Sequence, residues 1–266
     1  MKNILLTGGA GFIGSHVCAL LLEENNNVFL IDNFLNSSKN VLNNLKCIIP
    51  KNKSSNKLEV FKGDIRNEVF LREVFNFAKN KGNPINAVLH FASLKQVEES
   101  QKIPIEYWDN NLIGTIILLK TMEEFQCKTI IFSSSASVYS SNCISPISEK
   151  GEINPINTYG DTKVAIEKLL KGLTRNIDLG WKVSILRYFN PIGSHPSGLI
   201  GENNFINTTN IFPVICNVAS NKKDYLEIFG NDWNTFDGTC IRDYIHIMDV
   251  AEGHLCALDY LIYKTE

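Results

Sequence analysis

Short apolar runs alternate with amphipathic stretches along most of the chain. Each run has the length and the β-branched content of a buried strand; the runs are residues 3–7, 28–31, 58–62, 87–91, 129–133 and 182–187. Between them, apolar residues recur at helical spacing, as in the sets Ile13, Val17, Leu20, Leu21 and Ile166, Leu169, Leu170, Leu173. The alternation of strand and helix predicts βαβ units. The expected fold class is therefore α/β, with a Rossmann-like, doubly wound parallel sheet covered by helices on both faces.

The pattern changes after about residue 190. Pro, Gly and Asn become frequent there, and strand-like pieces such as residues 226–229 are short. We expect a nucleotide-binding domain over residues 1–189 and a smaller substrate-binding lobe over residues 190–266, at the carboxyl edge of the sheet. The part near residues 240–266 is expected to return to the main domain. Asp249 followed by Glu252 resembles a capping box and predicts the start of a last helix.

The composition narrows the classes of function. The 266 residues include 26 Lys and Arg against 28 Asp and Glu, and a net charge of −2 provides no basic surface for nucleic acid. The longest nearly apolar stretch, residues 112–119, is too short to cross a membrane, and the N-terminus does not resemble a signal peptide. The seven cysteines form no Cys-x-x-Cys pair, and the five histidines show no metal-ligand spacing. We expect a cytoplasmic protein with reduced thiols and no metal, nucleic-acid or membrane partner.

A glycine-rich turn links the first predicted strand to a helix. Gly8, Gly9, Gly11 and Gly14 match the dinucleotide-binding fingerprint and its close variant. Backbone N–H groups and the positive end of the helix dipole meet at such a turn and bind anions. Asp32 ends the second strand 18 residues after Gly14, where a carboxylate binds ribose hydroxyls and repels a 2′-phosphate. The predicted cofactor is therefore NAD rather than NADP; the alternative is a plain glycine turn beside a strand-end acid.

Two further strands end in residues that should line the same crevice. Asp64 and Ile65 follow the third strand, and Phe91 and Ala92 follow the fourth. Because the carboxyl ends of parallel strands meet at one edge of a sheet, we expect these residues near the cofactor. For Asp64, a role as a turn or capping residue remains the alternative.

Three residues are candidates for chemistry. Ser135 follows the fifth strand, and Tyr159 and Lys163 lie four residues apart at the start of a predicted helix, on one face. A tyrosine has a pKa near 10, so acting as a base at neutral pH requires a drop of about 3 units. A lysine charge at about 4 Å supplies roughly that much energy at an effective dielectric constant of about 20. We predict that Tyr159 is the acid/base, that Lys163 lowers its pKa, and that Ser135 orients the substrate oxygen.

At these residues the sequence resembles the UDP-glucose 4-epimerase family, which belongs to the extended short-chain dehydrogenases/reductases. The resemblance runs from residue 1 to 266 and rests on eight ordered blocks, residues 7–16, 32–33, 63–66, 90–95, 133–139, 159–163, 187–191 and 242–246. It implies interconversion of UDP-glucose and UDP-galactose through a 4-keto sugar, with tightly held NAD. The cofactor contacts that it implies are Gly8, Gly11, Phe12, Ile13, Gly14, Asp32, Asn33, Asn36, Asp64, Ile65, Phe91, Ala92, Lys95, Asn110, Ser133, Tyr159, Lys163 and Tyr188. The implied substrate contacts are Lys95, Ser135, Tyr159, Phe189, Asn190, Asn210, Ile211, Phe229 and Arg242.

Two departures from neighbouring patterns bear on the reaction. The related 4,6-dehydratases carry an acid beside the strand-end hydroxyl, and here Ala136 stands in that place, which disfavours dehydration. Ser93 stands where the epimerases usually have glycine, a change that should leave the cofactor contact intact. The resemblance also implies a homodimer through helices around residues 107–125 and 159–174, although burial against the sheet would explain the same apolar stripes.

The resemblance further implies that a C-terminal segment is missing, because the family continues with a strand and an arginine-containing segment that holds the diphosphate. Two alternatives to the leading function therefore remain. The chain could act on another UDP-sugar, an N-acetylhexosamine or a uronate, or it could be a truncated NAD-binding protein without activity.

Overall fold

The computed structural model of the chain describes residues 1–49, 57–202 and 210–263. Its main sheet has six parallel strands in the order β3-β2-β1-β4-β5-β6. The strands are β1 (Asn3–Thr7), β2 (Asn27–Asp32), β3 (Leu58–Lys62), β4 (Ala87–His90), β5 (Thr129–Ser133) and β6 (Lys182–Leu186). These bounds equal the predicted ones for β1, β3 and β5, differ by one residue at one end for β4 and β6, and differ by one residue at each end for β2. The expectation of a doubly wound parallel sheet is confirmed.

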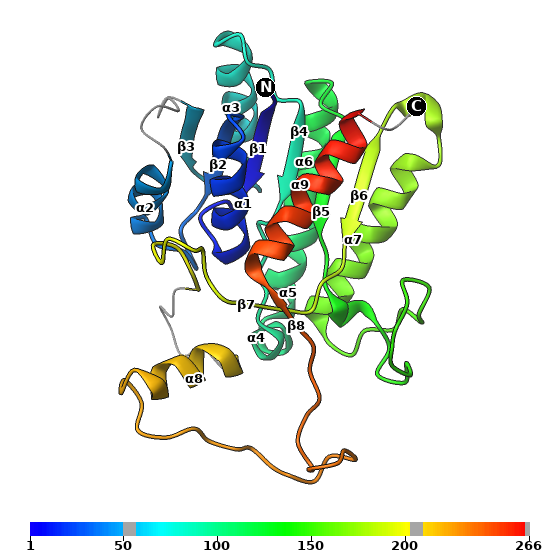
Figure 1. The fold of residues 1–266 in the computed structure, drawn as a ribbon. Helices are drawn as coiled ribbons and strands as arrows, with labels where there is room; N and C mark the ends of the chain where they lie inside the picture. Colours follow the sequence, from blue (N-terminus) through cyan, green and yellow to red (C-terminus); the bar gives the residue numbers. More distant parts are fainter. Residues whose placement is uncertain (50–56, 203–209, 264–266) are drawn as a thin grey trace.

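Helices cover both faces of the sheet (Figure 1). One face carries α1 (Phe12–Glu23), α2 (Asn40–Ile48) and α9 (Ile247–Tyr263), and the other carries α3 (Glu68–Asn80), α6 (Gly114–Glu124) and α7 (Thr158–Thr174). The alternation of side chains along β1 shows how the two layers form. Ile4 and Leu6 pack with α1 and α9, whereas Leu5 between them packs with α3 and α6. Both faces of the central strands are therefore dry.

The connection from β4 to α6 is a run of short helices. It consists of α4 (Val97–Lys102), α5 (Pro104–Tyr107) and a π-helix, η2 (Trp108–Ile113), which continues into α6. Pro104 stands at the start of α5, where its missing N–H costs nothing. The wider turn of η2 carries Asn110 and Asn111, and π-helical turns of this kind often occur at functional sites.

The described residues between 190 and 246 form a small second layer at the carboxyl ends of the strands, and α9 then returns to the main sheet (Figure 1). Strands β7 (Asn190–Ile192) and β8 (Tyr244–His246) pair in parallel, and α8 (Ile211–Ala219) lies on the segment between them. The strand expected at residues 226–229 is wrong: this segment has no regular structure. Its apolar side chains have no neighbouring strand to pack on, and Phe229 is 95% exposed.

The last helix, α9, begins two residues before the predicted capping residue. His246 takes the capping role, because its Nδ1 accepts a hydrogen bond from the backbone N–H of Met248 (3.3 Å). Asp249 lies in the first turn, where a carboxylate favours the positive end of the helix dipole. Leu258 and Leu261 of α9 are buried against α1 and the sheet. Within the described ranges, no helix has the length and apolar character needed to span a membrane.

The short helices η3 (Ala136–Val138) and η4 (Ile177–Leu179) flank α7 in the sequence. The first of them directly follows Ser135, whose side chain accepts a hydrogen bond from the backbone N–H of Ser137 (3.1 Å). This serine cap fixes the direction in which the chain leaves β5. The end of β5 is thus a tight turn rather than a loose loop.

Candidate active site

A cavity of about 670 Å³ opens at the carboxyl ends of the strands. Its wall combines the turn after β1, the ends of β2 to β5, the start of α7 and residues of the second layer. The wall includes these predicted site residues: Gly8, Gly11, Phe12, Ile13, Gly14, Asp32, Asn33, Asn36, Asp64, Ile65, Phe91, Ala92, Lys95, Asn110, Ser133, Ser135, Tyr159, Lys163, Tyr188, Phe189, Asn190, Asn210, Ile211 and Arg242. Phe229 is the predicted substrate residue that the structure does not place on this wall.

The glycine turn between β1 and α1 has the shape that a dinucleotide needs. Gly8 has a φ of +67°, and a Cβ there would lie 2.6 Å from the backbone nitrogen of Ala92. A Cβ on Gly14 would lie 2.5 Å from the carbonyl oxygen of Gly8. Among the described residues, no side chain caps α1, and the residues at its start, Gly11 to Gly14, line the cavity. These residues fit the pyrophosphate of NAD, which binds at such helix N-termini.

Asp32 is held at the end of β2 by the turn itself. Its Oδ2 accepts a hydrogen bond from the backbone N–H of Ala10 (2.9 Å), and its Oδ1 accepts from the backbone N–H of Phe34 (2.8 Å) and the hydroxyl of Ser37 (2.9 Å). The carboxylate is therefore fixed beside the glycine turn. A ribose hydroxyl is a suitable further donor to it.

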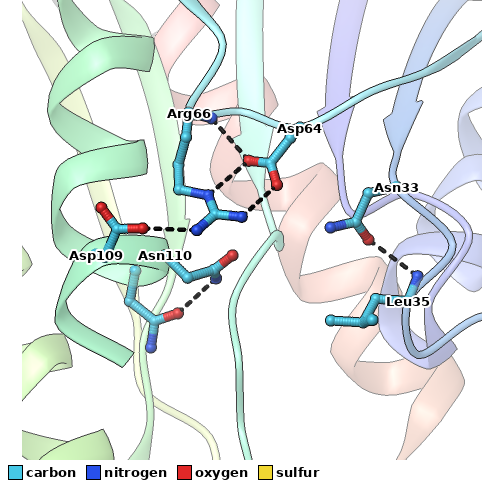
Figure 2. A network of polar contacts seen from close by, with 7 residues as sticks. Asn33, Leu35, Asp64, Arg66, Asp109 and Asn110 are labelled. Atoms are coloured by element: carbon cyan, nitrogen blue, oxygen red, sulfur yellow. Dashed lines mark hydrogen bonds and ion pairs between the residues drawn. The ribbon is translucent and has the colours of Figure 1, made fainter. Parts of the chain in front are cut away.

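Asp64 and Arg66 form the polar network in Figure 2. The Arg66 guanidinium binds both carboxylate oxygens of Asp64, through Nε (3.0 Å) and Nη2 (2.7 Å), and reaches Asp109 of η2 with Nη1 (2.6 Å). The backbone N–H of Arg66 also donates to Asp64 (2.9 Å). Hydrogen bonds from Arg66 hold the pKa of Asp64 below its usual range against the opposing effect of burial. The structure thus gives Asp64 a turn-forming role, and its contact with the cofactor stays a prediction.

The helix that carries Tyr159 and Lys163 is fixed at its first turn. The Asn157 side chain caps α7 by accepting a hydrogen bond from the backbone N–H of Gly160 (2.8 Å). A Cβ on Gly160 would lie 2.6 Å from the carbonyl oxygen of Ser137. The glycine therefore lets α7 approach the turn that follows Ser135, and the two candidate elements of the site meet there.

Lys163 is buried, with 3% of its surface exposed. Its Nζ donates a hydrogen bond to the carbonyl oxygen of Ser133 (2.9 Å) and lies 4.9 Å from the ring centre of Phe132 and 5.6 Å from that of Tyr159. Burial lowers the pKa of Lys163 to about 7. The Lys163 side chain therefore exchanges between its ammonium and neutral amine forms near physiological pH.

The expected lowering of the Tyr159 pKa by Lys163, to which the charge of oxidised NAD would add, is not produced by the protein's own groups. Burial raises the pKa of Tyr159, and a hydrogen bond with Ser135 lowers it by less, so the net direction is upward. The spacing of Tyr159 and Lys163 placed them on one face of α7, but it carried no information about how deeply the helix is buried. Desolvation outweighs the expected effect of the lysine because it acts on both groups.

A buried polar chain that the sequence did not single out supports these residues. His90 Nδ1 lies 2.6 Å from Thr7 Oγ1, and its Nε2 lies 2.9 Å from Thr115 Oγ1. Asn111 of η2 then donates to Thr162 of α7 (3.1 Å). Burial lowers the pKa of His90 to about 3, so the ring is neutral. Ser137, Glu202, Cys240 and Tyr244 also line the cavity without a prior signal for a role.

Together, the sheet order, the glycine turn, the strand-end acid and the Ser135, Tyr159 and Lys163 cluster define a Rossmann-like enzyme that binds a nicotinamide dinucleotide. The cluster and the turn that fits the pyrophosphate line the same cavity. The class of enzyme therefore follows from the position of the site at the carboxyl ends of the strands as much as from its residues.

The chain belongs to the NAD dependent epimerase/dehydratase family, which it matches over residues 4–262. NAD is the cofactor of this family. The chain is 45% identical over 262 residues to UDP-glucose 4-epimerase of Bacillus subtilis, covering 98% of this chain and 74% of that protein. It is 47% identical over 266 residues to the bifunctional protein GAL10 of Pachysolen tannophilus, covering 98% of this chain and 37% of that protein. The chain thus spans little more than a third of the bifunctional relative.

Solved structures agree with the fold. The crystal structure of UDP-glucose-4-epimerase from Stenotrophomonas maltophila, with bound NAD and formylated UDP-arabinopyranose, superposes with a TM-score of 0.90 at 38% identity. The match covers 99% of this chain and 75% of that one. The similarity therefore includes the second layer at the carboxyl ends of the strands as well as the main sheet.

Proposed function

We propose that this chain catalyses the reversible 4-epimerisation of UDP-glucose and UDP-galactose with bound NAD. The observation that carries the proposal is the position of Ser135, Tyr159 and Lys163 in the same cavity as the glycine turn. The names of the relatives at 45% and 38% identity support the same reaction.

In the proposed reaction Tyr159 removes the proton of the sugar 4-hydroxyl and later returns it to the same oxygen. NAD, when bound, supplies the acceptor and donor of the hydride at C4. Ser135 donates a hydrogen bond to the substrate oxygen and shares in holding the Tyr159 hydroxyl. Lys163 holds its Nζ 5.6 Å from the ring centre of Tyr159, and in its protonated form its charge favours the deprotonated phenol. The keto sugar turns over between the two steps and exposes its other face.

The substrate side of the cavity fits a nucleotide diphosphate. Arg242 lines the cavity and presents a guanidinium, whose planar donors match phosphate oxygens. Asn190 and Asn210 lie on the same wall, next to Phe189 and Ile211. We assign the UDP part of the substrate to these residues, with Lys95 between cofactor and sugar. Phe229 would contact the substrate, as predicted from the sequence, only if the segment around it folds over the cavity.

Epimerisation is favoured over dehydration because of the residue after Ser135. Ala136 opens η3 and has no group that transfers a proton. Loss of water from a 4-keto sugar needs an acid at that place. A panel of UDP-hexoses, UDP-N-acetylhexosamines and UDP-uronates should therefore yield 4-epimers and no dehydrated product, and the preferred sugar identifies the substrate.

The test measures two quantities on the purified 266-residue chain. The first is bound NAD, released by denaturation and quantified, and the second is conversion of UDP-galactose to UDP-glucose. A version extended at the C-terminus with the corresponding segment of the Bacillus subtilis relative is assayed beside it. Full cofactor content without epimerisation in either version would contradict the proposal. Activity in the extended version alone would place the reaction in a longer chain.

We also propose a domain division at residues 189 and 190, a homodimer and a cytoplasmic location. The exposed apolar side chains of Ile105, Trp108 and Ile113 lie in or next to the segment 107–125 expected in the dimer interface, and they support the proposed homodimer. All seven cysteines lie in described parts of the chain and are free thiols, which supports the proposed cytoplasmic location. Light scattering on the parent and on Ile113→Asp tests the dimer, because a charge in the interface should yield monomers.

A further inference from the structure

A buried ion pair lies directly behind the candidate catalytic residues. Glu167 follows Tyr159 and Lys163 on α7 at the same spacing of four residues, and its side chain is 3% exposed. Arg187, the residue after β6, donates to it through Nε (2.8 Å) and Nη2 (2.5 Å), with an arginine side chain that is 11% exposed. The pair joins the helix of the acid/base residues to the end of a strand.

The same carboxylate also holds the turn after β5. The Ser134 hydroxyl donates a hydrogen bond to Glu167 Oε1 (2.7 Å). Ser134 stands between Ser133, whose carbonyl oxygen accepts from Lys163, and Ser135, the candidate substrate contact. A displacement of Ser134 would therefore move both neighbours. Among the described residues, the Ser135 hydroxyl has no hydrogen bond to Glu167. Any influence of Glu167 on Ser135 therefore passes through the backbone.

Arg187 extends the contact to a third part of the site. Its Nη1 donates to the hydroxyl of Tyr139 (3.0 Å) and to the carbonyl oxygen of Glu149 (3.2 Å). The next residue, Tyr188, has its hydroxyl in contact with that of Ser133. The ends of β5 and β6 and the middle of α7 thus meet at one carboxylate.

Stability alone does not account for this arrangement. Burying two charges requires their desolvation, and apolar residues of similar volume usually serve the fold equally well or better. Burial opposes ionisation of Glu167, but hydrogen bonds from Arg187 and Ser134 outweigh it and hold its pKa below the usual value. The carboxylate is therefore charged at neutral pH and keeps a fixed set of donors around it.

We propose that Glu167 is a positioning residue of the active site, which holds Ser134 against α7 and so sets the place of Ser135 relative to Tyr159. The proposal rests on the proposed function only in its use of Tyr159 as the acid/base. The structure contains a direct consequence: the hydrogen bond with Ser135 lowers the pKa of Tyr159. A loosened Ser135 should let that pKa rise.

The test is a titration of Tyr159 that needs no turnover. Tyrosinate absorbance is recorded against pH for each protein and for the same protein with Tyr159→Phe, and the difference isolates Tyr159. In Ser134→Ala, which removes the hydroxyl that contacts Glu167, the Tyr159 titration should move to higher pH. Where epimerisation is measurable, kcat should fall on the order of tenfold with KM unchanged, because misplacement weakens the reacting geometry and not binding. The content of bound NAD should stay at the parent level.

A double variant separates position from stability. Glu167→Met with Arg187→Met replaces the pair by apolar chains and leaves no unpaired charge, so its thermal midpoint should stay near that of the parent while the Tyr159 titration shifts as in Ser134→Ala. Lys171→Ala removes an exposed partner of the same carboxylate, 3.4 Å away, and should shift nothing. Thr121→Ala deletes a buried hydroxyl on α6 that bonds to a backbone carbonyl, and should lower stability without moving the titration.

Two results would overturn the proposal. One is a Tyr159 titration in Ser134→Ala equal to that of the parent while Ser135→Ala shifts it. The other is a shift in Thr121→Ala as large as in Ser134→Ala, because the change would then follow stability alone. Failure of the proposed function has a different signature: Tyr159→Phe would retain full epimerisation, whatever the titrations show.

Discussion

The Lys163 ammonium donates its hydrogen bond to the carbonyl oxygen of Ser133, 2.9 Å away, and not to a carboxylate. A carbonyl oxygen offers partial charge only, so this lysine is buried without a counter-ion in contact among the residues that the structure describes. Burial accordingly lowers its pKa from 10.5 to about 7. The same relationship ties the lysine to the strand end that carries Ser135, and it makes the charge of the site sensitive to pH.

The stability of the protein should depend on Lys163 between about pH 7 and pH 10. Over this range the unfolded chain binds the proton and the folded chain does not, so the free energy of unfolding rises with pH. Lys163→Met removes the titrating group and should flatten this rise, with a gain of a few kcal/mol, as an order of magnitude, at pH 6. Thermal midpoints measured from pH 6 to 10 test this. Lys168→Met, exposed on the same helix, should keep the slope of the parent; an equally steep slope in Lys163→Met would contradict the burial argument.

Tyr159→Phe should abolish most epimerisation. Removing a positioned acid/base group costs about 100-fold to 10,000-fold in rate, while the ring remains to fill its place on α7. The measurement is kcat beside bound NAD and the circular dichroism spectrum, both of which should be unchanged. Tyr260→Phe, at an exposed position of α9, is the matched control and should behave as the parent. Unchanged turnover in Tyr159→Phe would remove the tyrosine from its assigned role.

Asp32→Asn should weaken NAD binding and reduce discrimination against NADP. Asparagine keeps an oxygen for only one of the two backbone donors, because Ala10 N–H bonds to Oδ2 and Phe34 N–H to Oδ1, and it loses the charge that repels a 2′-phosphate. We expect the dissociation constant for NADP divided by that for NAD to fall by about tenfold, which corresponds to roughly 1.4 kcal/mol of binding free energy. Titration calorimetry with each dinucleotide measures it. An unchanged ratio would show that another group sets the preference.

Two glycine-to-alanine changes should have opposite effects. In Gly14→Ala the new Cβ would lie 2.5 Å from the Gly8 carbonyl oxygen and 2.7 Å from the Gly9 Cα, so backbone must move. We expect a loss of about 1–3 kcal/mol in stability and little bound NAD. Gly253→Ala in α9 meets no atom within 4 Å and should stabilise the helix by up to about 1 kcal/mol. Denaturant unfolding and cofactor content distinguish the two, and equal losses would mean that the close packing of the turn is irrelevant.

The sequence predicted the sheet well because the central strands β1, β2, β4 and β5 are buried on both faces and are therefore nearly continuous apolar runs. It did not predict α2, in which Val41 and Leu45 are the buried residues, Leu42 and Ile48 are only partly buried, and Asn and Lys fill four of the other positions. The π-helix η2 also left no local pattern, because its wider turn depends on packing against α7. The expected strand at residues 226–229 failed for the complementary reason: an apolar run without a partner strand does not form a sheet.

The candidate site was predictable as far as short spacings describe it. The glycine turn and the Tyr159 and Lys163 pair are local patterns, whereas Glu167 and Arg187 lie 20 residues apart and meet only through the fold. The direction of the Tyr159 pKa shift was not predictable either, since desolvation is a property of the folded protein. Helical spacing says which residues share a face and nothing about what covers that face.

The packing of α9 has a consequence for the order in which the protein assembles on the ribosome. All six strands of the main sheet are synthesised by residue 186. The apolar layer that contains Ile4, Val17 and Leu21 is nevertheless completed only by Leu258 and Leu261 of α9. A nascent chain that has released every strand still exposes this layer to water, and α1 lacks its cover. We expect that the growing chain acquires a competent NAD site only after α9 has emerged, because the strand and helix that carry the glycine turn stay uncovered until then.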